Sequence, residues 1–300
     1  MNTISGKIKE AFSEGNVLVR LILINVLIWF GVKMLMLVFF LFNLQDGLAE
    51  GFIKWLAVPA NLGDLLVKPW TLVTYMFLHE DFFHILFNML WLYWFGRIFM
   101  EYLDGKKLSS TYILGGLAGA VLYIVAFNIF PVFSVIQPFS YALGASASVL
   151  AIVIAIATFV PNYTIYLMFL GPVKIKYIAM FSVLLDLLSI QSSNPGGHIA
   201  HLGGALFGYI YIQRLHTGKD MSKGFVKVLN SLSSYFYTTK SNMHVSHSSK
   251  DKYKTDEDYN YEKKVKQQQM DEILDKISKS GYESLTKEEK DLLFRISNKQ

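Results

Sequence analysis

The chain of 300 residues contains no cysteine, which excludes disulfide bonds, thiol catalysis and cysteine-ligated metal sites. Charge is also scarce, because only 17% of the residues are Asp, Glu, Lys or Arg. Hydrophobic residues make up 53% of the chain, and the mean hydropathy is +0.35. A soluble domain of this length is not expected to be so apolar, and the apolar stretches are close to bilayer length. The composition therefore predicts a membrane protein.

The charged residues are unevenly distributed along the chain. Residues 1–214 contain 12 basic and 10 acidic side chains, whereas residues 215–300 contain 16 and 13. The chain therefore divides into a membrane core and a more polar, soluble tail. Both parts are mildly basic, which fits a cytoplasmic membrane face better than nucleic-acid binding.

Six apolar segments are predicted to be transmembrane helices, and they make the core an all-α, six-helix bundle. They are residues 21–42, 82–100, 111–130, 143–160, 177–192 and 197–213. No signal-peptide cleavage site accompanies the first apolar run, which is interpreted as a retained anchor. The predicted domains are a cytoplasmic segment 1–20, a membrane domain 21–214, a polar linker 215–262 and a helical tail 263–300.

The basic residues predict the orientation of these helices. With the N-terminus in the cytoplasm, nine basic residues lie on the cytoplasmic side: Lys7, Lys9, Arg20, Arg97, Lys106, Lys107, Lys174, Lys176 and Arg214. The three outer loops then hold only Lys54 and Lys68, as the positive-inside rule requires. Both termini are therefore expected in the cytoplasm.

Lys33 and Asp186 are charged residues that fall near the middle of predicted spans. Lys33 lies in the first span, where it is expected to snorkel or to face protein rather than lipid. Asp186 is the single acidic residue within a predicted span. It is interpreted as a structural carboxyl, hydrogen-bonded or protonated, in preference to a catalytic one.

Three polar motifs interrupt the apolar segments: Gly144-Ala145-Ser146, Ala200-His201-Leu202-Gly203-Gly204 and His84-Ile85-Leu86-Phe87-Asn88. Polar groups are costly in hydrocarbon, so an intramembrane cluster of them is a candidate functional site. A hydroxyl, an imidazole and an amide also match the nucleophile, base and oxyanion donors of acyl transfer. The motifs therefore indicate nucleophilic catalysis if the fold brings them together.

The predicted topology places the three motifs at a similar depth. Each lies near the outer end of its helix, and at ~1.5 Å per residue the polar side chains sit roughly 3–9 Å below the outer boundary. Small residues, including the pair Gly204 and Gly208, predict close helix packing. Taken singly, a membrane serine suggests a packing residue, and a membrane histidine suggests a satisfied polar group or part of a proton or metal path. The combination is more specific to catalysis.

These motifs resemble those of the rhomboid family of intramembrane serine proteases, and the resemblance covers residues 15–214. The family's GxSx, HxxxN and AHxxGxxxG motifs correspond to residues 144–147, 84–88 and 200–208. The resemblance implies that Ser146 is the nucleophile and His201 the general base of a Ser-His dyad. It implies an oxyanion site of His84, Asn88 and the backbone N–H groups of Ala145 and Ser146. Supporting roles fall to Gly144, His79, Gly204 and Gly208, with no metal or cofactor.

The sequence departs from the family pattern at three positions. Ala147 follows the serine where glycine is common, and Thr71 follows Trp70 where arginine is frequent. Leu150 stands where a tyrosine often stacks under the catalytic histidine, so the imidazole must be held by other contacts. None of these changes removes a reacting group.

The resemblance also implies substrates and a location. The expected substrates are transmembrane proteins, cleaved near the outer face of a bacterial inner membrane. Residues 187–197, at the end of the fifth span and the turn after it, are candidates for a substrate gate. Two alternatives remain open. One is an inactive rhomboid-like adaptor, and the other is a transporter or channel with a proton path through His84, Asp186 and His201.

The tail is predicted to form a helical hairpin. Met270, Ile273, Leu274 and Ile277 follow helical spacing, and Gly281 is a plausible helix end. Residues 286–289 form a capping-box pattern that opens a second helix. The segment resembles a tail recurring on rhomboids of Bacteroidota-type bacteria. Docking on an unknown partner, docking on the core and a solubilising role all remain open.

Overall fold

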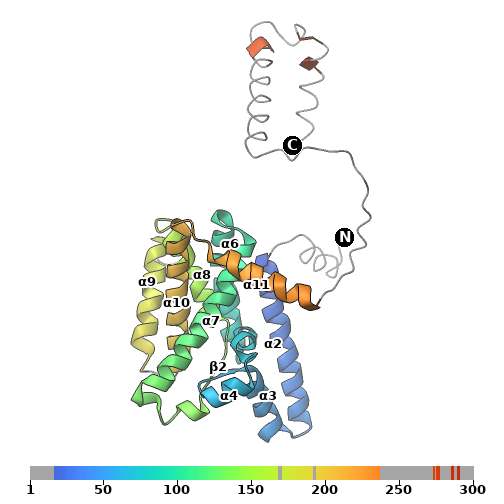
Figure 1. The fold of residues 1–300 in the computed structure, drawn as a ribbon, viewed down its shortest axis with the longest axis vertical. Coiled ribbons are helices and arrows are strands. Elements are labelled where there is room, and N and C mark those ends of the chain that lie inside the picture. Colours follow the sequence, from blue (N-terminus) through green and yellow to red (C-terminus); the bar gives the residue numbers. More distant parts are fainter. Residues whose placement is uncertain are drawn as a thin grey trace. The chain divides into compact units, whose positions relative to one another are not determined.

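The computed structural model divides the chain into two compact units, Met1–Thr238 and Thr239–Gln300. The described residues are 17–167, 171–191, 194–236, 273, 275–277, 285–286 and 289–290. The first unit is a helical bundle (Figure 1).

Six long helices coincide with the six predicted segments. They are α2 (Val17–Leu41), α6 (Phe82–Tyr102), α7 (Gly105–Ile129), α8 (Ser146–Phe159), α9 (Ile175–Ser189) and α10 (Pro195–His216). Within the described part of the chain, α2, α6 and α7 are long and apolar enough to cross a membrane. Helices α8 and α9 have only 14 and 15 residues. The chain is therefore a multi-pass membrane protein, and the count of six spans stays a prediction.

Local capping explains where two of the helices begin. The Asp104 carboxylate accepts the N–H of Lys107, so α7 begins at Gly105, six residues before the predicted span. Asn194 accepts the N–H of Gly197 in the same way, and Pro195 occupies the first position of α10. The cap at Asn194 sets the start of the helix that carries His201.

The connecting segments contain short helices and four short strands. The helical turns are η1 (Gln45–Ala49), α3 (Glu50–Leu56), α4 (Leu62–Val67), α5 (Thr71–Thr74), η2 (Tyr75–Phe77), η3 (Pro131–Phe133) and η4 (Gln137–Phe139). Strand β1 (Val58–Pro59) pairs antiparallel with β2 (Tyr141–Ala142), and β3 (Thr164–Leu167) with β4 (Gly171–Lys174). The protein is mostly helical, as predicted, and these short strands in the loops were not predicted. Strands of two and four residues are too short to show an alternating hydrophobic pattern.

The core of the bundle is a close packing of α10 against α7, α8 and α9 (Figure 1). A Cβ atom on Gly204 would overlap the carbonyl oxygen of Ala147, and one on Gly203 would lie 2.6 Å from that of Ala118. The backbones of α7, α8 and α10 thus touch where side chains would hold them apart. This confirms the packing predicted from the small residues, and it brings the first turn of α8 beside α10.

Helix α11 (Met221–Phe236) was not expected, because its residues fall in the predicted linker 215–262. The linker prediction was wrong for this stretch. Its apolar residues recur at helical spacing on one face, but the many serines and lysines between them gave it a polar composition. The helix packs against α7 and α10, and in Figure 1 it runs across the end of the bundle.

In the second unit, the described residues are helical at 273, 275–277 and 289–290. The predicted capping box is confirmed, because Thr286 N–H donates to Glu289 at 2.7 Å and Glu289 N–H donates to the Thr286 hydroxyl at 3.3 Å. Lys276 forms an ion pair of 2.9 Å with Glu289, which joins the two predicted helices. The rest of the predicted hairpin lies outside the described residues.

Candidate active site

A glycine turn delivers Ser146 to the start of α8. Gly144 has a φ of +129°, and its N–H donates to the Tyr75 carbonyl at 2.9 Å. A Cβ atom at Gly144 would lie 2.9 Å from the His84 ring, so both conformation and space favour glycine. The turn places Ser146 as the first residue of α8.

Ser146 and His201 are in direct contact. The Ser146 Oγ lies 2.6 Å from His201 Nε2, although the two residues are 55 positions apart in the sequence. Both line a cavity of about 570 Å³ formed by residues of α6, α8, α9 and α10. The polar lining residues are His84, Asn88, Ser146, Ser182, Asp186, Ser189, His198 and His201. The fold therefore collects the predicted polar residues of three helices in one cavity.

Asp186 and His198 also line the cavity, although neither belongs to the three sequence motifs. Asp186 Oδ1 lies 2.8 Å from His201 Nδ1 and 2.8 Å from His198 Nδ1. Asp186 is buried, as expected for a hydrogen-bonded carboxyl in a span. The sequence marked Asp186 as the one acidic residue within a predicted span. Spacing along the chain does not reveal which residue of α10 this carboxylate faces.

The predicted oxyanion donors differ in their surroundings, because the two side chains line the cavity whereas the Ala145 N–H contacts His79. His84 and Asn88 both line the cavity, and Asn88 Nδ2 donates to the His84 carbonyl at 3.0 Å. The N–H of Ala145 donates to His79 Nε2 at 3.5 Å, so this predicted oxyanion donor is engaged by His79 in the structure. The N–H of Ser146 lies in the first turn of α8, where backbone donors have no partner within the helix.

His79 packs behind this turn and not in the cavity. Burial, together with the neighbouring His84, lowers the pKa of His79 to about 4, so the ring is neutral at physiological pH. A neutral imidazole can accept the Ala145 N–H, and the ring also meets that of His84 edge-on at 5.1 Å. These contacts support the structural role predicted for His79.

Asp186, His198 and His201 also form a potential metal-binding group, because their donor atoms all lie within 4.8 Å of one another. The two nitrogen–oxygen distances of 2.8 Å match charge-assisted hydrogen bonds. A metal ion bound at about 2.0–2.2 Å from each donor would hold the donors further apart. The observed geometry therefore fits direct hydrogen bonding.

Comparison with known proteins shows the family to which the chain belongs. Residues 66–217, half of the chain, match the Rhomboid domain, which describes a family of intramembrane serine proteases. Residues 253–299 match a family of unknown function, DUF6576. The chain is 32% identical over 158 residues to RHOMBOID-like protein 12, mitochondrial, of Arabidopsis thaliana, a match that covers 50% of this chain and 47% of the relative. It thus spans about half the length of that relative. The Rhomboid match covers the helices that carry Ser146 and His201, and the chain belongs to the rhomboid family.

Proposed function

We propose that the protein is an intramembrane serine endopeptidase that cleaves transmembrane segments of other membrane proteins. The observation that carries this proposal is the 2.6 Å contact between Ser146 Oγ and His201 Nε2. A hydroxyl is a weak nucleophile on its own, and an adjacent imidazole activates it by accepting its proton. The contact is within the distance at which a general base works.

The reaction follows from these two groups. His201 accepts the Ser146 proton as the oxygen attacks a peptide carbonyl, and the imidazolium then protonates the leaving amine. The resulting acyl-enzyme reacts with water, which passes its proton to His201 and restores the Ser146 hydroxyl. The products are two shorter polypeptides, and no cofactor enters the balance.

The oxyanion of the tetrahedral intermediate needs hydrogen-bond donors close to Ser146. The Ser146 N–H at the start of α8 is one candidate, and the helix dipole adds positive potential there. Asn88 and His84 line the same cavity and are the side-chain candidates. One well-placed donor of this kind contributes about 3–4 kcal/mol to transition-state stabilisation. The Asn88 amide has two N–H donors, and because one donates to the His84 carbonyl, the other would serve the oxyanion.

The cavity wall indicates how a transmembrane substrate would enter. Phe83 and Phe87 of α6 and Leu185 of α9 line it, and their side chains are largely exposed at the surface. Apolar side chains on the outside of a membrane bundle face lipid, so a substrate helix can approach the cavity between α6 and α9. Cleavage near the outer face follows from the predicted orientation, and a bacterial inner membrane is the location that the resemblance implies.

The test is covalent labelling of the full chain in liposomes with a fluorophosphonate, which reacts with activated serines. We expect one adduct per chain, and peptide mapping should place it on Ser146. A reporter with one transmembrane segment, reconstituted with the protein, should be cut within or next to that segment. Absence of both reactions in folded protein would contradict the protease and favour an inactive adaptor.

A further inference from the structure

We infer that Asp186 is a positioning residue for His201, and that His198 holds the same carboxylate in place. Asp186 and His198 would turn the Ser146–His201 pair into a network of four residues. This inference rests on the proposed function but concerns groups for which the family motifs in this sequence provide no role. It begins from the two 2.8 Å contacts that converge on Asp186 Oδ1.

The contacts determine which nitrogen of His201 carries the proton. An ionised carboxylate only accepts hydrogen bonds, so Nδ1 of His201 must be the donor to Asp186. In a neutral imidazole the other nitrogen, Nε2, is then the acceptor. Nε2 is the atom that faces the Ser146 hydroxyl at 2.6 Å. The Asp186 carboxylate therefore selects the tautomer in which His201 acts as a base.

Burial gives Asp186 a reason to keep both partners. The residue is 8% exposed, and a buried carboxylate is costly unless it is hydrogen-bonded. His198 and His201 are three positions apart on α10, so their rings lie on one face of that helix. Both rings contact the same carboxylate oxygen of Asp186, which belongs to α9. The contact with His198 holds the carboxylate in place, and the carboxylate accepts a hydrogen bond from His201.

The network also acts during the reaction. When His201 takes the proton from Ser146, its ring becomes positively charged in a partly buried site. The carboxylate at 2.8 Å stabilises that charge without taking the proton, and it holds the ring while the proton passes to the leaving amine. Asp186 need not touch substrate for this role.

The experiment compares Asp186→Asn with the control Tyr177→Phe on the same helix. Tyr177 is an exposed residue of α9 that does not line the cavity. An asparagine amide can donate to Nδ1 and so favour the wrong tautomer. We expect kcat for the reporter to fall about 10²–10⁴-fold in Asp186→Asn with KM unchanged, and to stay unchanged in Tyr177→Phe.

A spectroscopic measurement separates this inference from the proposed activity. Nitrogen-15 spectra of histidine-labelled protein distinguish the Nδ1–H tautomer from the Nε2–H tautomer, and the His201 signal is assigned by its loss in His201→Ala. We expect Nδ1–H in wild type and its loss in Asp186→Asn. Wild-type kcat and an unchanged tautomer in Asp186→Asn would overturn the inference while the protease stands. An inactive wild type with the Nδ1–H tautomer would contradict the protease alone.

A second inference comes from α11 and is independent of the active site. The spanning helices α6 and α7 are joined by the turn at residues 103–104, so this turn lies at a membrane surface. Helix α11 packs against α7, and the two share a cavity with Asp104, Lys106 and Lys107. Helix α11 is therefore held at the level of the membrane surface.

Helix α11 is amphipathic, as expected for a helix at the membrane surface. Met221, Phe225 and Val228 follow the spacing i, i+4, i+7, while Lys223 and Lys227 lie on the opposite face. Val228 is 56% exposed, so this face is left uncovered by the bundle. A helix with one apolar and one lysine-bearing face lies in the interface plane of a bilayer.

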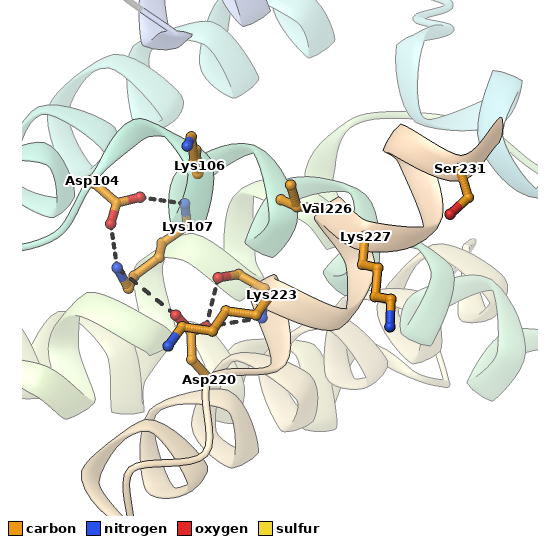
Figure 2. A pocket seen from close by; sticks show the side chains of 9 residues that line it. Asp104, Lys106, Lys107, Asp220, Lys223, Val226, Lys227 and Ser231 are labelled. Carbon is orange, nitrogen blue, oxygen red and sulfur yellow. Dashed lines mark hydrogen bonds and ion pairs between the residues drawn. The ribbon is translucent and has the colours of Figure 1, made fainter. Parts of the chain in front are cut away.

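The lysines surround a cavity of about 640 Å³ beside the helix (Figure 2). It is lined by Lys106, Lys107, Lys223 and Lys227 against Asp104 and Asp220, which leaves two positive charges in excess. Figure 2 shows Lys107 reaching between the two carboxylates, and Asp220 also accepts from the Ser222 hydroxyl at 2.6 Å. The acids are thus engaged by Lys107 and Ser222, and the excess charge comes from the other three lysines.

We propose that this cavity binds the phosphate of an anionic lipid while the apolar face of α11 inserts between the acyl chains. The ligand chemistry is a phosphate group at the membrane surface, which the excess positive charge attracts. The exposed apolar face of the same helix, opposite Lys223 and Lys227, selects a lipid over a free phosphate, because only a lipid also supplies hydrocarbon.

The test uses native mass spectrometry of the full chain with phosphatidylglycerol and phosphatidylcholine. We expect the triple variant Lys106→Gln, Lys223→Gln, Lys227→Gln to lose affinity for phosphatidylglycerol by roughly 10–100-fold. Lys68→Gln, Lys174→Gln, Lys176→Gln removes the same charge elsewhere and should bind as wild type. Equal retention by both triple variants would overturn the proposal, as would full displacement of the lipid by inorganic phosphate.

Nitroxide labels measure the depth of α11 without reference to lipid type. In liposomes, a label at Val228 should be relaxed by oxygen dissolved in the bilayer, whereas a label at Lys227 should be relaxed by a water-soluble nickel chelate. Equal access of the chelate to both positions would show that α11 does not insert.

Discussion

Replacing Ser146 or His201 by alanine is expected to lower the rate of reporter cleavage by roughly 10⁴–10⁶-fold. Ser146→Ala removes the oxygen proposed to attack the substrate, and His201→Ala removes the proposed base, which lies 2.6 Å from it. Because the two groups act as a unit, the double variant should be no slower than either single one. Both variants should also lose fluorophosphonate labelling.

Ser148→Ala is the matched control for this prediction. Ser148 lies two positions further along α8 and is fully buried, and its Oγ has no hydrogen-bond partner among the described residues. Its loss should leave the rate of cleavage close to that of wild type. Wild-type cleavage by Ser146→Ala would show that another residue is the nucleophile. Loss of activity in Ser148→Ala would show that any change at the start of α8 is disruptive.

The contact between Ser146 and His201 could be predicted from the sequence because each polar residue stands out against an apolar helix. Their similar predicted depth and the small residues on their helices indicated that the two side chains lie close together. The partner of Asp186 could not be predicted in this way. Whether Asp186 meets α10 depends on the rotation of α9 about its own axis, and hydrophobicity all around a helix leaves that rotation undetermined.

The His201 ring needs a contact that replaces the tyrosine, because Leu150 stands at that position. A leucine cannot hold an imidazole through hydrogen bonds, so the sequence required other contacts for His201. The structure provides Asp186 at 2.8 Å, on a different helix. Leu150 lines the same cavity and contributes apolar surface to it.

Helix α11 was missed for a different physical reason. Its composition is polar enough for a linker, and only the angular distribution of its residues shows the apolar face that Met221, Phe225 and Val228 share. Strands β1 and β2 were missed because the paired residues Val58 and Ala142 lie far apart in the sequence, whereas β3 and β4 are neighbours that are too short to show an alternating pattern. By contrast, the Thr286–Glu289 capping box is local, so four residues were enough to predict it.

Gly204→Val is expected to destabilise the membrane domain by about 3 kcal/mol and to abolish detectable cleavage. The added Cβ would overlap the carbonyl oxygen of Ala147, a backbone atom that cannot rotate away. Helices α8 and α10 would have to separate, and Ala147 is the residue next to Ser146, the proposed nucleophile. A displacement of 1 Å between reacting groups can cost about 10²-fold in rate, in addition to the lost stability.

Gly31→Val on α2 is the control, because no described atom lies within 4 Å of the position that its Cβ would occupy. Both substitutions place the same β-branched residue in a helix, so the difference between them measures packing alone. Thermal unfolding in detergent and the rate of fluorophosphonate labelling provide the two readouts. We expect Gly31→Val to match wild type in both. Gly204→Val with wild-type stability and labelling would mean that α8 and α10 do not meet at this glycine, and the contact between Ser146 and His201 would then need another explanation.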